Sequence, residues 1–348
     1  MGKIRTRLGD GSVIELSESE LQSDLEDGTQ DAAERGKISP LSQDELRYLA
    51  ELFKRTDRSV GVDVGKEVVL SYDCGPLKIK RSYSTASKFQ SLQILERLLG
   101  ADTLEMAHVD YSYKPAKQLL WMDQPIMEQA LLVTIPAMFY GAMPNLGLYT
   151  QPDGPCINPM ELLPQGKIAE ARASFEEMVE HAVKDMVFVA STMYEAGADG
   201  INFDTTGAAG DGDFLAALQA TEILRHKYPD MCIEMGMAGE FIFGMHGALT
   251  YDGVRLAGLY PREQLKLAEK AGASIFGPAV NTNTDSSCPR DVARSSTFIK
   301  DCVKNSNILV HGNVGMGVCG MPMQDVLPVD SVSRASKAMV EITGLDGL

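Results

Sequence analysis

The chain has 348 residues and a formal net charge of −16, from 48 acidic and 32 basic residues. This negative charge repels phosphate backbones and anionic lipid, so it argues against nucleic-acid and membrane partners and leaves cationic partners open. The N-terminus has no apolar run of signal-peptide length, and no segment is apolar for long enough to cross a bilayer. We therefore expect a cytoplasmic protein.

The six cysteines are scattered along the chain and form no CxxC pair. This spacing argues against both a zinc site and a disulfide framework. Free cysteine behaves as a small apolar side chain, so we expect reduced and mostly packed thiols and no metal.

Residues 1–95 are polar and acidic, with short helical patches, and we interpret them as an N-terminal appendage. Ser42 and Glu45 have the spacing of a capping box and predict the start of a helix. From residue 96 to residue 348, short apolar strands alternate with helices of 3.6-residue periodicity, which is typical of a βα architecture.

Six strands are predicted in this second region. They are residues 104–109, 131–139, 200–204, 232–236, 274–278 and 308–312. A long apolar stripe from Phe175 to Met193 predicts a helix that covers one face of the sheet. Further helices are expected after Pro289, which suits a first helical turn, and after Asp330 as N-cap. We predict an α/β fold of the TIM-type (β/α)8 barrel, incomplete at the C-terminus because six strands do not close it.

Two glycine-rich segments have the composition of cofactor-binding loops. The pattern GxGxxG at residues 315–320 would indicate a dinucleotide site, but Pro322 and Pro328 prevent a helix from opening there. The segment GAAGDG at residues 207–212 is acidic and lies in mid-chain, so it favours a tight βα connection capped by Asp213.

Polar residues gather at the predicted strand ends, where the chemistry of a barrel takes place. They are Glu105, His108, Asp110, Asn202, Asp204, Glu234, Glu240, Asn281, Asn283, His311 and Asn313. Apart from Lys114, no basic residue accompanies them, which disfavours a phosphate ligand. An acidic, amide-rich mouth suits a small cation such as an amine, although divalent metals remain an alternative.

Several longer motifs resemble one family. They are DYSYKP at 110–115, FYGAMPN at 139–145, NFDTT at 202–206, AGDGD at 209–213, GMHG at 244–247, YDGV at 251–254, NTNT at 281–284 and RASKAMVE at 334–341. Together they resemble the dimethylamine:corrinoid methyltransferases of methylamine metabolism. The resemblance covers nearly the whole chain and is looser before about residue 100.

The resemblance implies removal of one methyl group from dimethylamine, its transfer to Co(I) of a separate corrinoid protein, and release of monomethylamine. No DxHxxG motif surrounds any histidine, so no corrinoid is expected to bind this chain directly. In the family, pyrrolysine follows the segment that resembles Gly344 to Leu348, encoded by an amber codon. We accordingly expect pyrrolysine just after Leu348, and we expect the 348-residue form, which lacks it, to be inactive.

For the proton transfers of this reaction, strand-end position favours Glu234, Asp204 and Glu240 as catalytic residues. The substrate-binding residues predicted on the same basis are His108, Asp110, Asn281 and His311. These assignments follow from predicted strand ends and not from matched family positions. Homo-oligomerisation is left open.

Two other hypotheses are carried forward. A complete barrel with lyase or decarboxylase chemistry would need a lysine or a set of metal ligands at the mouth, and neither is evident. Alternatively, the short form is a non-catalytic binding protein that docks the corrinoid partner, in which case it should accumulate as a stable species.

Overall fold

The computed structural model describes residues 3–7, 13–54, 77–78, 85–86, 139–142, 146–278, 289–312 and 337–347. Five parallel strands form the main sheet: β5 (Phe139–Ala142), β6 (Gly200–Thr206), β7 (Cys232–Met237), β10 (Ile275–Gly277) and β11 (Leu309–Val310). Their order in the sheet, β5-β6-β7-β10-β11, is their order in the chain.

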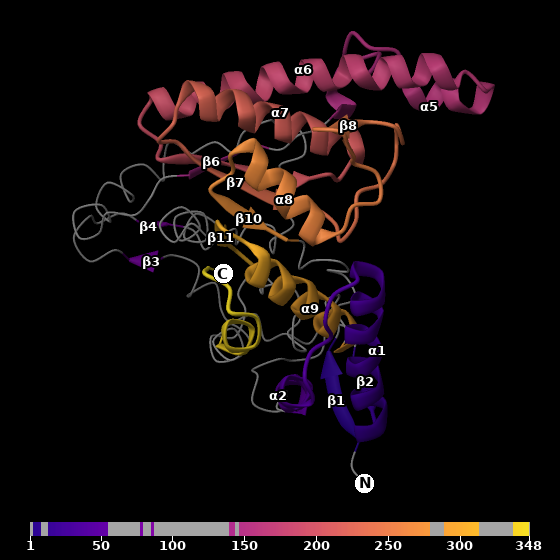
Figure 1. The fold of residues 1–348 in the computed structure, drawn as a ribbon, viewed down its shortest axis with the longest axis vertical. Coiled ribbons are helices and arrows are strands. Elements are labelled where there is room, and N and C mark those ends of the chain that lie inside the picture. Colours follow the sequence, from indigo (N-terminus) through magenta and orange to yellow (C-terminus); the bar gives the residue numbers. More distant parts are fainter. Residues whose placement is uncertain are drawn as a thin grey trace.

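Long helices connect these strands. They are α6 (Ile168–Glu195), α7 (Asp211–Lys227), α8 (Pro261–Ala271) and α9 (Pro289–Asn305) (Figure 1). The β5–α6 connection also contains η4 (Leu146–Tyr149), α5 (Pro159–Leu162) and η5 (Leu163–Gln165), and the β7–α8 connection contains the hairpin β8 (Thr250–Tyr251) and β9 (Val254–Arg255). The predicted βα alternation is confirmed from β6 onward.

The main core lies between the sheet and the helices. Alternate strand residues, among them Ile201, Phe203, Ile233, Met235 and Phe276, are fully buried against apolar side chains of α6, α7 and α8. Because side chains alternate along a strand, the residues between them face the other side of the sheet. That second face carries the polar residues described below.

A sheet whose strands follow chain order, with helices packed on one face, is the arrangement of part of a (β/α) barrel. The five strands described do not close into a barrel. Of the six predicted strands, the first lies outside the described residues, as does most of the second; β5 begins at residue 139, where that second prediction ended. The other four are found where they were predicted, within a few residues.

The N-terminal region forms a small sheet of β1 (Ile4–Arg7) and β2 (Val13–Leu16), then α1 (Glu18–Gly36) and α2 (Gln43–Lys54). Ser17 and Glu20 make a reciprocal capping box at α1, and Ser42 and Glu45 make the predicted one at α2. A short antiparallel pair, β3 (Leu77–Lys78) and β4 (Thr85–Ala86), follows.

Helix α1 packs closely along α9 (Figure 1). A Cβ atom on Gly28 would lie 2.0 Å from the Arg290 carbonyl oxygen, so only glycine allows this approach. Leu21 and Leu25 of α1 share a buried cluster with Val292 of α9 and Ile342. The N-terminal helices are therefore part of a core shared with the second region, and the boundary near residue 95 stays a prediction.

The C-terminal residues return to the sheet edge. Residues 337–343 are helical, and Gly347 then forms a parallel bridge with His311 at the end of β11. The Gly312 N–H donates to the Gly347 carbonyl oxygen at 2.9 Å. Within the described part of the chain, no helix is both long and apolar enough to span a membrane.

Candidate active site

Polar side chains from three strands share the sheet face that lies opposite the main helix layer. In the strand register, Asn202 of β6 pairs with Glu234 of β7. Glu234 also pairs with Ile275 of β10, and Ile275 pairs with Leu309 of β11. Asp204 and His311 lie two residues further along their strands and so point to the same side. We call Asn202, Asp204, Glu234 and His311 the polar face.

Glu234 and His311 are in direct contact. The His311 Nδ1 atom lies 2.8 Å from the Glu234 Oε1 atom, and the side chains are 24% and 10% exposed. Such a pair can hold one proton between a carboxylate and an imidazole, and either group can pass it to a bound ligand. One predicted catalytic residue and one predicted substrate-binding residue are thus brought together.

Two glycines open space over the polar face. Gly277 is the last residue of β10 and pairs with Gly236 of β7, so neither strand carries a side chain at this level of the sheet. A Cβ atom on Gly277 would lie 3.2 Å from the Gly236 Cα atom, which is tighter than ordinary packing. Gly236 and Gly277 therefore form a floor without side chains between the polar groups.

Two oxygen atoms converge above this floor. A Cβ atom on Gly236 would lie 3.3 Å from the Asp204 Oδ1 atom and 3.6 Å from the Asn202 Oδ1 atom. The Asn202 Oδ1 atom is buried and has no hydrogen-bond partner among the described residues. Because a buried acceptor without a donor is unfavourable, this atom marks a place where a ligand N–H could bind.

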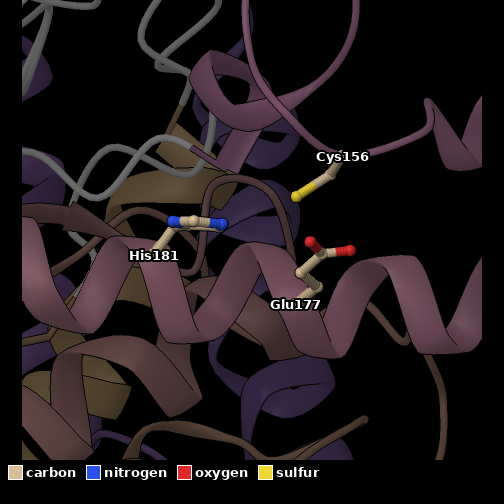
Figure 2. Close-up of side chains that lie close together, drawn as sticks. All are labelled: Cys156, Glu177 and His181. Atoms are coloured by element: carbon tan, nitrogen blue, oxygen red, sulfur yellow. The ribbon is translucent and has the colours of Figure 1, made fainter.

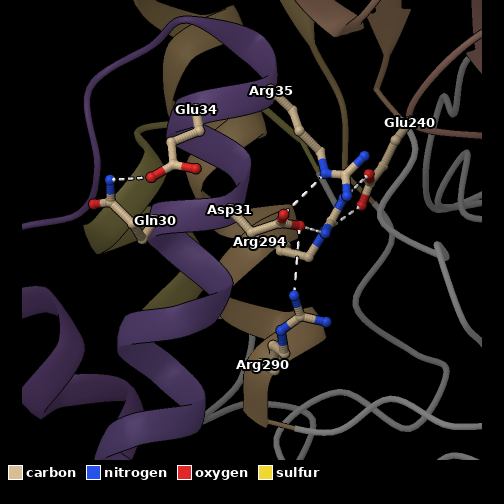
Figure 3. A network of polar contacts seen from close by, with 7 residues as sticks. All are labelled: Gln30, Asp31, Glu34, Arg35, Glu240, Arg290 and Arg294. Carbon is tan, nitrogen blue, oxygen red and sulfur yellow. Dashed lines mark hydrogen bonds and ion pairs between the residues drawn. The ribbon is translucent and has the colours of Figure 1, made fainter.

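Glu240, the third predicted catalytic residue, lies in an ionic network that links the β7–α8 connection to α1 (Figure 3). Arg294 donates from Nε to the Glu240 Oε1 atom at 2.8 Å and from Nη2 to Oε2, and it also pairs with Asp31. Asp31 in turn pairs with Arg35 at 2.9 Å and with Arg290 at 3.6 Å. This contact indicates a structural role for Glu240, and its catalytic role stays a prediction.

The remaining predicted residues, His108, Asp110 and Asn281, lie outside the described residues. Asp213 accepts from the Ala209 N–H at 2.9 Å, as a tight βα connection requires, although the N-cap itself is Gly210. Burial raises the Asp213 pKa to about 7, while hydrogen bonds from the Ala209 and Leu146 backbones oppose that rise.

Sequence reasoning missed the roles of Asp211 and His246. Asp211 is fully buried and accepts from the backbone N–H groups of His246 at 2.9 Å and Gly247 at 2.7 Å. The His246 Nε2 atom contacts Glu176 at 2.9 Å. The GMHG motif at residues 244–247 was the signal for this network, which holds the β7–α8 connection against α6 and α7.

Asp204 and His311 lie toward the carboxyl ends of their strands, where α/β enzymes carry their chemistry, whereas Glu234 lies within β7 and not at its end as predicted. The family model described as dimethylamine methyltransferase matches residues 2–348. The chain therefore belongs to the dimethylamine methyltransferase family, and the predicted resemblance is confirmed. No solved structure gives a significant match to this chain.

Proposed function

We propose that this chain provides the catalytic barrel of a dimethylamine:corrinoid methyltransferase. In this reaction one methyl group passes from dimethylamine to Co(I) of a separate corrinoid protein, and monomethylamine is released. The observation that carries the proposal is the Glu234–His311 pair on the polar face of a chain that matches the family along its length. The proposal includes closure of the sheet into a (β/α)8 barrel and location in the cytoplasm.

The polar face suits a small ammonium ion. Dimethylammonium carries one positive charge and two N–H donors, and Asn202 and Asp204 present oxygen atoms on the same side of the floor. None of the described strand residues of this face is lysine or arginine, so within this part of the chain no fixed cation of the strands opposes the ligand. A Schiff-base lyase would need a lysine amine at this face, and the described strand residues of the face do not provide one.

In the proposed reaction, the side chains of the polar face bind the amine and control whether its nitrogen is protonated. When the N–C bond breaks, its electron pair stays on nitrogen, so a nitrogen that carries an additional proton leaves as a neutral amine. An amine that is bound in its neutral form lacks this proton, and Glu234 and His311 would then supply it as the general acid, whereas a bound dimethylammonium ion already carries it. Asn202 and Asp204 orient the ligand, so that one methyl group is presented for displacement.

Pyrrolysine is the further group that the family resemblance implies, and it supplies an electrophilic imine that can bind an amine. The residues present fit such a group beside His311. Gly347 runs parallel to β11, and a Cβ atom on it would lie 3.4 Å from the His311 Cδ2 atom. Glu234 and His311 are the described residues that would hold an amine bound to such a group, and a chain without the group is proposed to be inactive.

The experiment compares variants of the protein as it is made in its native host, with the cognate corrinoid protein as acceptor. Glu234→Gln keeps the shape but removes the carboxylate, and we expect monomethylamine formation to fall by about 10²-fold or more. Glu222→Gln, in an exposed carboxylate of α7 that contacts Tyr251, is the matched control and should retain activity. Full activity of a folded Glu234→Gln enzyme would overturn the assignment.

The same assay, applied to the two chain lengths, distinguishes the proposed enzyme from the non-catalytic binding protein. Under the proposal, host protein that contains a residue beyond Leu348 produces monomethylamine, whereas the 348-residue form does not. If the host accumulates mainly the 348-residue form and that form binds the corrinoid protein without turnover, the binding-protein hypothesis replaces the enzyme.

A further inference from the structure

A cysteine, a glutamate and a histidine from two separate segments meet on the helix layer (Figure 2). Glu177 and His181 are one turn apart on α6, so their side chains leave the same face of the helix. Cys156 comes from the connection between η4 and α5 and points toward them. One ligand atom from each residue lies within 4.8 Å of the other two.

The loop holds Cys156 in place through backbone contacts. The Cys156 N–H donates to the Tyr149 carbonyl oxygen at 2.8 Å, and the Gln151 N–H donates to the Cys156 carbonyl oxygen at 2.8 Å. Gly154 packs so closely that a Cβ atom would lie 2.1 Å from the Tyr149 carbonyl carbon. The loop is therefore closed on itself, and the Cys156 side chain is directed inward with 1% exposure.

The His181 ring is held by a second contact. It stacks on Tyr149, with ring centroids 5.6 Å apart and an interplanar angle of 18°. The Tyr149 hydroxyl donates to the Asp185 Oδ2 atom at 2.8 Å, one turn further along α6. This stack limits rotation of the His181 ring, so the imidazole stays beside Cys156 and Glu177.

We propose that Cys156, Glu177 and His181 bind one divalent transition-metal ion of the zinc type. Sulfur, imidazole nitrogen and carboxylate oxygen are the donors that zinc accepts, and three protein ligands leave a fourth position for water. Binding replaces the thiol proton, which passes to solvent, with the metal–sulfur bond. Small side-chain rotations bring the three atoms to the shorter separations of a tetrahedral site.

The ion would tie the β5–α6 connection to the middle of α6. The site lies on the helix side of the sheet, away from the polar face, so it acts on the fold and not on the methyl group. Burial and the Glu177 carboxylate raise the pKa of the Cys156 thiol, which makes it a poor nucleophile when no cation is bound.

The sequence predicted no metal, because its cysteines form no CxxC pair. The proposed site differs from that prediction. The sequence separates Cys156 from Glu177 by twenty residues, and the closed loop brings them together. The i, i+4 spacing of Glu177 and His181 was visible in the sequence but is common on exposed helices.

The test uses the full chain after chelator treatment, titrated with Co²⁺ and then with Zn²⁺. We expect one Co²⁺ per chain, with a thiolate-to-cobalt charge-transfer absorption that Zn²⁺ abolishes. Changes to residues that only orient a ligand weaken metal sites about 10–100-fold, so Cys156→Ser and His181→Gln should each weaken binding at least about tenfold. Cys232→Ser, in a free cysteine outside the cluster, is the matched control and should bind as the parent does.

Several results would overturn the site. They are Co²⁺ binding without thiolate absorption, absorption that persists in Cys156→Ser, and equal loss in the Cys232→Ser control. Far-UV circular dichroism shows whether the variants fold; if Cys156→Ser does not, His181→Gln decides, because its imidazole is half-buried and less important for packing. Neither activity nor pyrrolysine enters this measurement, so its outcome is independent of the proposed function.

Discussion

Arg294 joins two carboxylates that belong to different parts of the fold, so its removal should be strongly destabilising. The Arg294 side chain is 13% exposed, Glu240 is 6% exposed and Asp31 is 20% exposed. Arg294→Met leaves Glu240 buried without this cation, whereas Asp31 keeps Arg35 and Arg290. Breaking a buried ion pair from one side costs about 3–5 kcal/mol.

Thermal unfolding followed by circular dichroism measures this loss. At about 2 °C per kcal/mol for a large domain, the Tm of Arg294→Met should fall by roughly 6–10 °C. Adding Glu240→Gln removes the carboxylate charge that faced Arg294, so the double variant should regain part of the lost stability. The double variant also shows that the loss comes from charge and not from packing alone.

An exposed ion pair provides the control. Lys270 and Asp252 form a pair with side chains 53% and 51% exposed, and such pairs contribute about 0–1 kcal/mol. Lys270→Met should therefore leave Tm nearly unchanged. If Arg294→Met lowers Tm no more than Lys270→Met does, the network does not join α1 to the β7–α8 connection as described.

Three further outcomes are expected. Gly277→Ala places a methyl group 3.2 Å from the Gly236 Cα atom. We expect a marked loss of apparent amine affinity in steady-state kinetics and only a small fall of Tm in thermal unfolding. Because the folded pKa of Asp213 is raised to about 7, its stabilising contribution is present at low pH and lost as pH rises from about 4 to about 7. Asp213→Asn should flatten this dependence in urea unfolding at several pH values, and an unchanged slope would contradict the buried, protonated acid. Ser17→Ala removes the α1 capping bond and should cost about 1 kcal/mol in the same assay, whereas a neutral result would mean that the cap is not formed.

Local signals in the sequence predicted much of the fold. The apolar stripe from Phe175 to Met193 lies within α6, and the capping box at Ser42 opens α2. Four of the predicted strands are present because short apolar runs between glycine and proline can form buried parallel strands. These features depend on neighbours in sequence, so a single sequence suffices.

Contacts between distant segments could not be predicted in this way. Glu240 was interpreted as a strand-end acid, because nothing in the sequence shows that Arg294 lies beside it. Gly236 and Gly277 are visible as strand residues, but only the register makes them adjacent. The Glu234–His311 contact likewise depends on three strands that are placed side by side.

The most direct test of the account is methyl transfer itself. The protein from its native host is mixed with its corrinoid protein in the Co(I) state, dimethylamine is added, and the cobalt spectrum and the amine products are followed together. The account predicts loss of Co(I) that depends on dimethylamine, with one monomethylamine formed for each methylated cobalt. A protein that docks the corrinoid partner but leaves Co(I) and dimethylamine unchanged would contradict the account.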